Sequence, residues 1–334
     1  MIEKLLMDHD LSKLKFLVTG GAGFIGCNLV ETLLAQGAGS VRALDNFSNG
    51  KKENVQEFLS HPNFELIEGD ISVMEHCMAA CESMDFVLHQ AALGSVPRSI
   101  RDPLASNQAN VSGFVNMLFA AVNCKVKRFV FASSSSVYGD DQTMPKIESK
   151  TGNLLSPYAV TKMTNELYAQ VFSRTYDLEI IGLRYFNVFG PKQSVDGPYA
   201  AVIPIFINEL LCGRAPGIFG DGTTTRDFTY VENVVQANIL AALTGNRTAI
   251  NTIYNIAYGG TTSLNSLFIN IAVILKSPIK VNYLPERKGD IKDSFANIEK
   301  AKNLLGYSPT VDIRDGLART VEWYQKQLKE LQIK

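Results

Sequence analysis

Short apolar runs alternate with longer segments of helical periodicity through the first half of this 334-residue chain, and no other feature limits its fold as much. The apolar runs predict six strands, at residues 15–18, 40–45, 64–70, 85–90, 128–133 and 178–185. The segments between them predict helices at 24–36, from Pro103 onward, and at 157–176. Strands separated by helices pair in parallel through right-handed crossovers. The chain is therefore predicted to form an α/β fold with a doubly wound parallel sheet.

Beyond Gly190, prolines and glycines interrupt this alternation. A helix at 229–243 and a strand at 254–259 resume it, and shorter elements follow. We therefore expect two lobes, the larger of which binds a nucleotide and the smaller of which binds the substrate. The larger lobe comprises residues 1–190 and about 228–260, and the smaller, C-terminal lobe comprises about 191–227 and 261–334.

The composition argues against several classes of function. The 32 Lys and Arg residues balance the 33 Asp and Glu residues, so no basic surface predicts nucleic-acid binding. No uninterrupted apolar run approaches the ~20 residues that span a bilayer. The N-terminal stretch MIEKLLMDHDLSKLK fits neither a secretory signal nor a transit peptide, and it predicts a short amphipathic helix. Five cysteines without metal-type spacing predict reduced thiols in a cytoplasmic protein, and no metal site.

A glycine-rich turn separates the first strand from its helix. The stretch TGGAGFIG (19–26) places Gly20, Gly23 and Gly26 in the spacing G-x-x-G-x-x-G, a variant of the dinucleotide fingerprint. Glycines there permit a tight turn, a close approach to a pyrophosphate and tight packing of the helix on the sheet. The larger lobe is therefore predicted to be a dinucleotide-binding (Rossmann) domain.

Two carboxylates follow the next strands. Asp45 ends the second strand, where a carboxylate binds the adenosine ribose and repels an added phosphate, so NAD is favoured over NADP. Alternatively, Asp45 is a turn residue of LDNFSNG. Asp70 follows the third strand, where it either binds the adenine amino group or is a solvated loop carboxylate.

The stretch YAVTK puts Tyr158 and Lys162 four residues apart on one helix face. A free tyrosine has a pKa of about 10 and is a poor base at neutral pH. A nearby ammonium and a positively charged nicotinamide would lower this pKa toward neutrality, a shift of ~3 units that needs ~4 kcal/mol. The pair therefore predicts a catalytic base, with a surface Tyr/Lys pair as the plain alternative. Just before it, FASSSSVYGD (131–140) carries four serines at a strand end and no acid among them.

These stretches, together with RYFNVFGP (184–191), resemble the extended short-chain dehydrogenase/reductase family over nearly the whole chain. The resemblance implies a tightly bound NAD. It also implies that Tyr158 is the catalytic base, that Ser134 hydrogen-bonds the reacting sugar hydroxyl, and that Lys162 holds the cofactor ribose. The residues that it assigns to the cofactor are Gly20, Gly23, Phe24, Ile25, Gly26, Asp45, Asn46, Asp70, Ile71, Gln90, Ala91, Ala92, Ser133, Tyr158, Lys162 and Tyr185.

The missing acid separates related activities within this family. The 4,6-dehydratases carry an Asp-Glu pair where Ser135 and Ser136 stand, and UDP-glucuronate decarboxylases carry a glutamate at the place of Ser136. Hydroxyls position a sugar but cannot drive elimination, so the resemblance implies a 4-epimerase. In that reaction Tyr158 takes the proton of the 4-hydroxyl while carbon 4 passes a hydride to NAD⁺. The 4-keto sugar then turns and is reduced on its other face, without net redox change.

A sugar that turns must be held by its nucleotide. The resemblance implies that Phe219 packs on uracil, that Arg226 and Arg287 pair with the diphosphate, and that Asp290 accepts from the uridine ribose. The full set that it assigns to the substrate is Gly94, Ser95, Ser134, Ser135, Ser136, Tyr158, Asn187, Ala201, Val202, Phe219, Arg226, Arg287, Asp290 and Ser294.

The choice of sugar rests on small residues. Ser294 matches a position that borders the sugar pocket, where a tyrosine is typical of enzymes limited to glucose and galactose. Ala201 and Gly94 add further room, and HQAALGSVPRS (89–99) resembles epimerases for N-acetylated UDP-hexosamines used in bacterial surface polysaccharides, such as O antigen. The resemblance thus implies interconversion of UDP-GlcNAc and UDP-GalNAc, with weaker activity on UDP-Glc and UDP-Gal.

Three alternatives stay open at this point. A UDP-uronic-acid (GlcA or GlcNAcA) 4-epimerase would need cations for the sugar carboxylate, and Arg98 or Lys192 are the candidates. A non-catalytic NAD-sensing regulator on the same fold would be expected to lack Tyr158 or Lys162. Net oxidoreductase activity is the third. The resemblance further implies a homodimer, formed through a four-helix contact by the helix from Pro103 and the helix that contains Tyr158.

Overall fold

The computed structural model describes residues 9–195, 201–286 and 293–333, the side chains of 330–333 excepted. Its centre is a seven-stranded sheet in the order β11-β6-β5-β4-β1-β2-β3, and every neighbouring pair is parallel. The strands are β1 (Lys15–Thr19), β2 (Ser40–Asp45), β3 (Phe64–Glu68), β4 (Phe86–His89), β5 (Arg128–Ser134), β6 (Glu179–Tyr185) and β11 (Thr252–Ile256). The doubly wound parallel sheet predicted from the sequence is confirmed.

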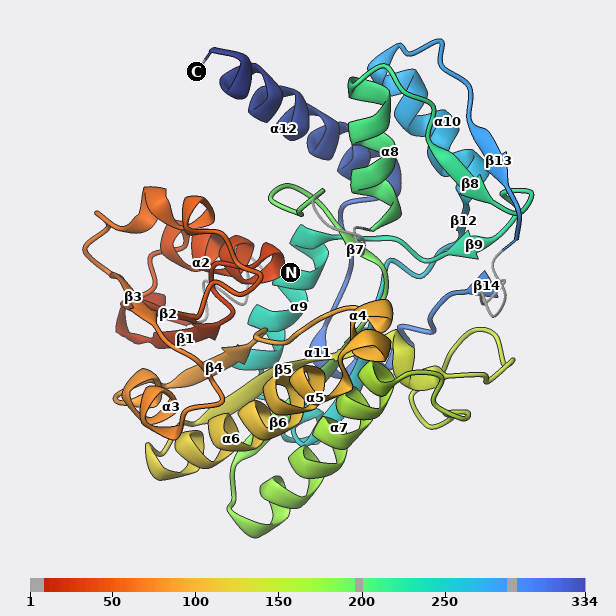
Figure 1. Cartoon of the computed structure of the whole chain (residues 1–334). Helices are drawn as coiled ribbons and strands as arrows, with labels where there is room; N and C mark the ends of the chain where they lie inside the picture. Colours follow the sequence, from red (N-terminus) through yellow and green to blue (C-terminus); the bar gives the residue numbers. More distant parts are fainter. Residues whose placement is uncertain (1–8, 196–200, 287–292, 334) are drawn as a thin grey trace.

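Helices cover both faces of this sheet (Figure 1). One face carries α3 (Met74–Cys81), α6 (Gly113–Asn123) and α7 (Pro157–Thr175), and the other carries α2 (Phe24–Ala35), α9 (Val231–Leu243) and α11 (Glu299–Leu305). The two faces bury separate apolar clusters, which is why the buried strands read as nearly continuous apolar runs.

The helix predicted from Pro103 is composite. It begins as α5 (Pro103–Asn107), widens into the π-helical turn η4 (Gln108–Ser112) and continues as α6. The wide turn carries the buried Asn110, whose side chain bonds the backbone of Leu93 and the hydroxyl of Thr161. A separate short helix, α4 (Val96–Arg101), precedes it.

The strand predicted at 254–259 is displaced toward the N-terminus, because β11 ends at Ile256. The N–H groups of Tyr258 and Gly259 donate to the side chain of Asp227 and are therefore not part of the ladder. A contact between residues some thirty positions apart thus decided where this strand ends.

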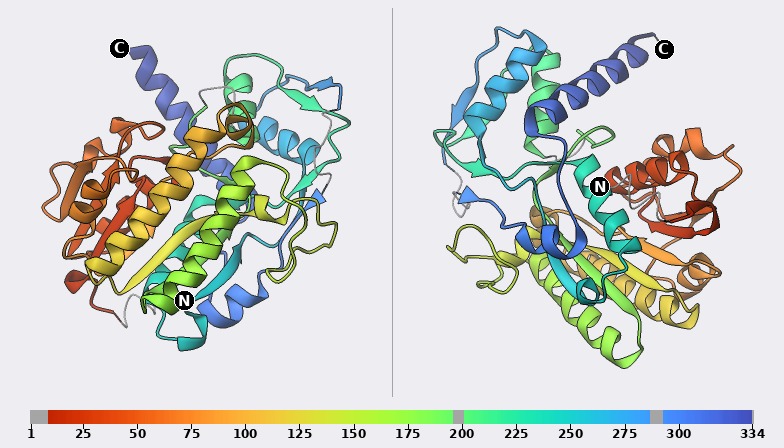
Figure 2. Two further views of the ribbon diagram at one scale, coloured as in Figure 1. Left: turned by 60° about the horizontal axis from the view of Figure 1, so that its bottom comes forward. Right: turned by 180° about the vertical axis from the view of Figure 1, so that it is seen from behind.

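A second group of elements lies beyond one end of the large sheet (Figures 1 and 2). It contains the helices α8 (Val202–Leu211), α10 (Leu264–Leu275) and α12 (Ile313–Ile333). Its short strands pair as β8 (Gly217–Phe219) with β13 (Asn282–Leu284), and as β9 (Thr225–Arg226) between β12 (Thr262–Ser263) and β14 (Asp293–Ser294). A further pair, β7 (Val188–Phe189) with β10 (Thr229–Tyr230), joins this group to the sheet, while the lobe boundaries at 190, 227 and 260 stay a prediction.

The remaining short elements are 3₁₀ turns, namely η1 (Leu11–Lys13), η2 (Lys52–Asn54), η3 (Gln56–Phe58), η5 (Ser135–Tyr138) and η6 (Arg247–Ala249). The predicted N-terminal helix falls mostly on residues outside the described part of the chain, as do the predicted substrate residues Arg287 and Asp290. Across the described residues, no helix combines the length and the apolar character needed to cross a membrane.

Candidate active site

The glycine turn between β1 and α2 has the geometry that its spacing predicts. Gly20 has φ +66°, and a Cβ there would lie 2.9 Å from backbone atoms of Ala91. A Cβ on Gly26 would lie 2.0 Å from the carbonyl oxygen of Gly20, so this helix packs directly on the turn. Only glycine fits at these two positions, and the space that their missing side chains leave is a cradle of the kind that a pyrophosphate requires.

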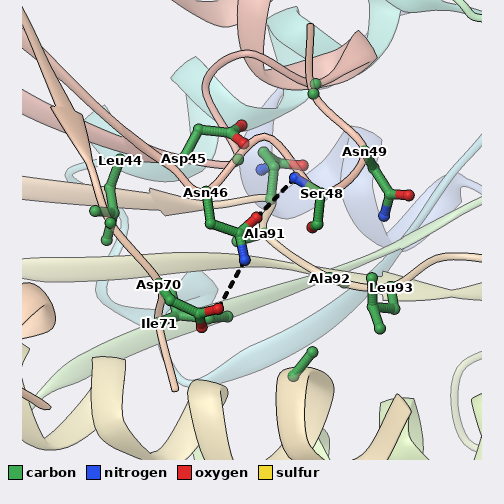
Figure 3. A pocket seen from close by; sticks show the side chains of 16 residues that line it. Leu44, Asp45, Asn46, Ser48, Asn49, Asp70, Ile71, Ala91, Ala92 and Leu93 are labelled. Atoms are coloured by element: carbon green, nitrogen blue, oxygen red, sulfur yellow. Dashed lines mark hydrogen bonds between the residues drawn. The ribbon is translucent and has the colours of Figure 1, made fainter. Parts of the chain in front are cut away.

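A pocket of about 100 Å³ opens beside this turn, between the ends of β2, β3 and β4 (Figure 3). Asp45 lies at its edge, with its carboxylate held by the N–H groups of Ala22 at 2.9 Å and Phe47 at 2.8 Å. Burial raises the pKa of this carboxyl above its ordinary value, although these two hydrogen bonds oppose the shift. Across the pocket, the Asn46 amide donates to Asp70 at 2.8 Å.

Asp70 is the more acidic of these two carboxyls. Burial acts to raise its pKa, but hydrogen bonds from Ser72 and Asn46 outweigh that effect and leave the pKa below its ordinary value. Asp70 is therefore an ionised acceptor, already oriented by its neighbours, at the mouth of the pocket.

A second cavity of about 620 Å³ adjoins the first. The two share the lining residues Gly20, Gly23, Asn49, Gln90 and Ala92. The larger one extends to Ser134, Tyr158 and Lys162, and we call it the catalytic cleft. Every residue that the sequence predicted for the cofactor lines one of these two cavities. The glycine cradle, the carboxylate at the end of β2 and the joined cavities fit a dinucleotide.

Tyr158 and Lys162 lie on the first two turns of α7, whose N-cap is Ser156. The Lys162 ammonium donates to the carbonyl oxygen of Ala132 at 2.8 Å and lies 5.9 Å from the centroid of the Tyr158 ring. Burial lowers the pKa of Lys162 to about 8, because a low-dielectric surrounding disfavours the ammonium.

The pKa of Tyr158 differs from the expectation. The sequence argument predicts a lowered value, whereas burial raises it and the Ser134 side chain only partly opposes the increase. The prediction counted on two positive charges. The Lys162 ammonium is instead directed to the carbonyl oxygen of Ala132. The second charge would come from the nicotinamide ring of the cofactor.

The four serines at the end of β5 do different things. Ser133, which lines the cleft, donates its hydroxyl to Glu166 at 2.5 Å. Ser134 accepts the N–H of Ser136 at 3.1 Å and so caps η5. The buried hydroxyl of Ser136 has no hydrogen-bond partner among the described residues, and Ser136 is not among the residues that line the cleft. Only part of the serine run therefore faces the cleft.

Sequence reasoning missed the side chains that support this cleft from behind. Glu166 forms a buried ion pair with Arg184, at 2.9 and 2.7 Å, which ties α7 to β6. Asn238 of α9 donates to the Tyr185 hydroxyl at 2.8 Å and accepts from the Gln90 amide at 3.0 Å. The stretch 231–243 carries four polar residues, Glu232, Asn233, Gln236 and Asn238, so no signal in the sequence singles out Asn238.

The predicted substrate residues divide into two groups. Gly94, Ser95, Ser134, Ser135, Tyr158, Asn187 and Ala201 line the catalytic cleft. Val202 begins α8, Phe219 lies in β8, and Arg226 is the register partner of Ser294 in the β9–β14 pair. These three, Ser136 and Ser294 are not among the residues that line the cleft.

The comparisons with known proteins agree with this geometry. Residues 16–257 match the model of the NAD dependent epimerase/dehydratase family. The UDP-glucose 4-epimerase of Mycolicibacterium smegmatis is 36% identical over 316 residues, which cover 94% of this chain and 99% of that protein.

Two solved structures have nearly the same fold. A UDP-N-acetylglucosamine 4-epimerase from Methanobrevibacter ruminantium, in complex with UDP-N-acetylmuramic acid, is 41% identical with a TM-score of 0.89, over 94% of this chain and 99% of that one. A UDP-glucuronic acid 4-epimerase from Bacillus cereus, with UDP-glucuronic acid and NAD, is 31% identical with a TM-score of 0.87, over 94% of this chain and 100% of that one.

Proposed function

Because the chain belongs to the NAD-dependent epimerase/dehydratase family, whose UDP-sugar 4-epimerases are among its relatives, we propose that it interconverts UDP-GlcNAc and UDP-GalNAc. The observation that carries the chemistry is the character of the catalytic cleft. Ser134, Ser135 and Tyr158 line it, and no Asp or Glu does so among the described residues. Elimination of water or loss of carbon dioxide needs an acid there, whereas epimerisation needs only a base and groups that orient the sugar.

In the proposed mechanism Tyr158 takes the proton of the sugar 4-hydroxyl and returns it to the same oxygen when carbon 4 is reduced on its opposite face. Ser134, which interacts with Tyr158, orients that hydroxyl. Lys162 holds the cofactor ribose, and its positive charge favours the phenolate form of Tyr158. When bound, NAD supplies the acceptor and donor of the hydride at carbon 4. The 4-keto sugar turns about its diphosphate link between the two hydride transfers.

Small side chains support the N-acetyl sugar as substrate. Gly94 and Ala201 line the cleft, and a Cβ added at Gly94 would meet no atom within 4 Å. This space suits an acetamido group. Ser294 is not among the residues that line the cleft, but the resemblance assigns it to the border of the sugar pocket, where a tyrosine would take up more room. The similarity to an epimerase named for UDP-N-acetylglucosamine supports the same choice.

A uronic acid is the second candidate, since UDP-glucuronate 4-epimerases are also relatives. The cations that would receive its carboxylate are already engaged. Lys192 lies 2.9 Å from Glu31 and 3.1 Å from Glu57, and Arg98 donates to Asn49 at 2.6 Å. These pairings favour an uncharged substituent on the sugar. The presence of both Tyr158 and Lys162 in one cleft argues against a mere NAD sensor.

We also propose a homodimer that forms through α5–α6 and α7. These helices lie side by side on one face of the sheet (Figures 1 and 2). Their outer surface, which we call the α6/α7 face, exposes large apolar side chains at Leu104, Phe119, Val160, Leu167, Tyr168 and Val171. Burial of such a face in a second copy would produce a four-helix contact.

The test is a substrate panel. Purified protein, without added NAD, is incubated separately with UDP-GlcNAc, UDP-Glc and UDP-GlcA while NMR follows the anomeric signals. We expect UDP-GalNAc to form well ahead of UDP-Gal. Turnover of the uronic acid alone would contradict the choice of sugar but not the mechanism, and no turnover of any, even with NAD supplied, would contradict both.

A variant tests the size argument directly. Ser294→Tyr should suppress conversion of UDP-GlcNAc and spare that of UDP-Glc, because the larger ring fills space needed only by the acetamido group. Ser294→Ala, which adds no volume, is the matched control and should behave as the wild type. Equal losses on both sugars in Ser294→Tyr would contradict a selective role.

A further inference from the structure

The short helix α4 lies between the loop that follows β2 and the first turn of α7. It belongs to the stretch GSVPRSI (94–100), and its N-cap Ser95 accepts the N–H of Arg98 at 3.2 Å. Two adjacent residues of α4, Arg98 and Ser99, make contacts in different directions, and neither contact is required by the reaction proposed above.

Arg98 reaches the loop that follows β2. Its guanidinium donates to the side-chain oxygen of Asn49 at 2.6 Å. Asn49 lines both the smaller pocket, between the ends of β2, β3 and β4, and the catalytic cleft. Gly94 and Ser95 line the cleft just before α4. The Arg98–Asn49 contact therefore joins two segments of the cleft wall, the loop after β2 and the segment after β4, where the two cavities meet.

Ser99 reaches the catalytic helix. Its fully buried hydroxyl accepts the backbone N–H of Tyr158 at 2.9 Å and donates to the carbonyl oxygen of Val96 at 2.8 Å. The first turn of α7 makes this contact significant. Pro157 has no N–H and Ser156 accepts from Ala159, so Ser99 satisfies the orphan donor of Tyr158 itself.

We propose that α4 acts as a latch on the catalytic cleft. Arg98 holds the loop 46–50 against α4 through Asn49, and Ser99 links this closed arrangement to the position of Tyr158. The inference rests on the proposed assignment of the cleft to NAD. Both are positioning residues. A catalyst that performs two opposite hydride transfers in each turnover must retain its cofactor between them, and a bond that holds the loop 46–50 to α4 slows dissociation because the loop must open first.

The cofactor half of the proposal is tested by NAD retention, without any sugar. Arg98→Ala, Asn49→Ala and the double variant are loaded with NAD and dialysed, and the nucleotide that remains is quantified by absorbance after acid release. We expect each single variant to lose NAD faster by about tenfold, the effect of one charge-assisted hydrogen bond. The double variant should be no faster than the singles, because both remove the same contact.

Two matched variants sharpen this measurement. Arg98→Lys keeps a donor for Asn49 and should recover part of the retention. Arg101→Ala removes the same charge from the same helix and should release NAD as slowly as the wild type. Release from Arg98→Ala at the wild-type rate would overturn the latch. Additive effects of Arg98→Ala and Asn49→Ala on the rate of NAD release would also overturn it, because Arg98 would then act on the cofactor directly and not through Asn49. A wild type that never retains NAD would instead contradict the assignment of the cleft.

The catalytic half is tested by Ser99→Ala. Removal of the hydroxyl leaves the Tyr158 N–H without its partner, so kcat should fall by about tenfold while KM and NAD content stay unchanged. A purely structural role would lower the melting temperature and leave kcat per folded molecule intact. An unchanged kcat would therefore overturn the link between α4 and Tyr158.

Discussion

Burial moves the pKa values of Tyr158 and Lys162 in opposite directions. It raises that of the phenol and lowers that of the ammonium to about 8, because a dry cleft favours the neutral form of each group. The two pKa values, which nearly coincide in water, are therefore further apart in the cleft, with that of the phenol the higher. A further positive charge in the cleft would favour the phenolate, which is the form that the proposed base needs.

Tyr158→Phe should reduce kcat by a factor of roughly 10²–10⁴, because it removes the proton acceptor and leaves the ring. NAD content should be unchanged, since the ring still packs in the cleft. Tyr168→Phe is the matched control, because Tyr168 lies on the same helix and outside the cleft. NMR of the UDP-sugar provides the rates, and a Tyr158→Phe variant of wild-type activity would exclude the proposed base.

At the scale of elements, Asp227 joins the short segments of the second group. Its fully buried carboxylate accepts the N–H groups of Tyr258, Gly259 and Ala296, and its carbonyl oxygen accepts from Asn187. The groups that donate to its carboxylate are backbone N–H groups from distant loops, so the ends of β9, β11 and β14 converge on one side chain. Burial raises the pKa of Asp227 to about 6, and the hydrogen bonds from Ala296, Gly259 and Tyr258 oppose that rise.

This raised pKa makes stability depend on pH. The folded state holds the Asp227 proton up to about 6, whereas an unfolded chain releases it near 3.8, so folding loses stability as the pH rises through 6. In Asp227→Asn this dependence is absent. The wild-type free energy of unfolding, minus that of the variant, should fall by about 1 kcal/mol between pH 5 and pH 7. Urea denaturation at both pH values measures it, and a pH-independent difference would contradict the assignment.

At the scale of the molecule, the α6/α7 face is the apolar surface that a partner copy would cover. Leu104 is 81% exposed, Leu167 57% and Val171 55%. Residues 167 and 171 are one turn apart on α7 and project from the same side. Exposure of this extent on adjacent helices is typical of an interface.

The double variant Leu167→Glu with Val171→Glu should convert a dimer into a monomer, because two carboxylates in each copy would be buried without partners. Light scattering after gel filtration measures the mass. Ile269→Glu on α10, where the side chain is also 57% exposed, is the matched control and should leave the mass unchanged. A wild-type monomer, or a double variant that stays dimeric, would contradict the proposed contact.

Most regular elements were predictable because the pattern of burial is local. The strands of the first half and helices α2 and α7 lie where the apolar periodicity predicts them, within about two residues. The strand β11 was displaced because Asp227 takes the N–H groups beyond its end. The helix from Pro103 contains a π-helical turn, with the buried Asn110 at its centre, that no periodicity indicates.

The sequence alone determined the glycine turn, the Tyr158–Lys162 spacing and the carboxylate at the end of β2, because each depends on neighbours within a few residues. Only the tertiary structure decided which of the four serines face the cleft, what Arg98 binds and where Asp227 is buried. Ser133 meets Glu166 across 33 positions of the chain, Arg98 meets Asn49 across 49, and Asp227 meets Ala296 across 69. Such partners are set by the packing of separate elements, and no local pattern of residues records them.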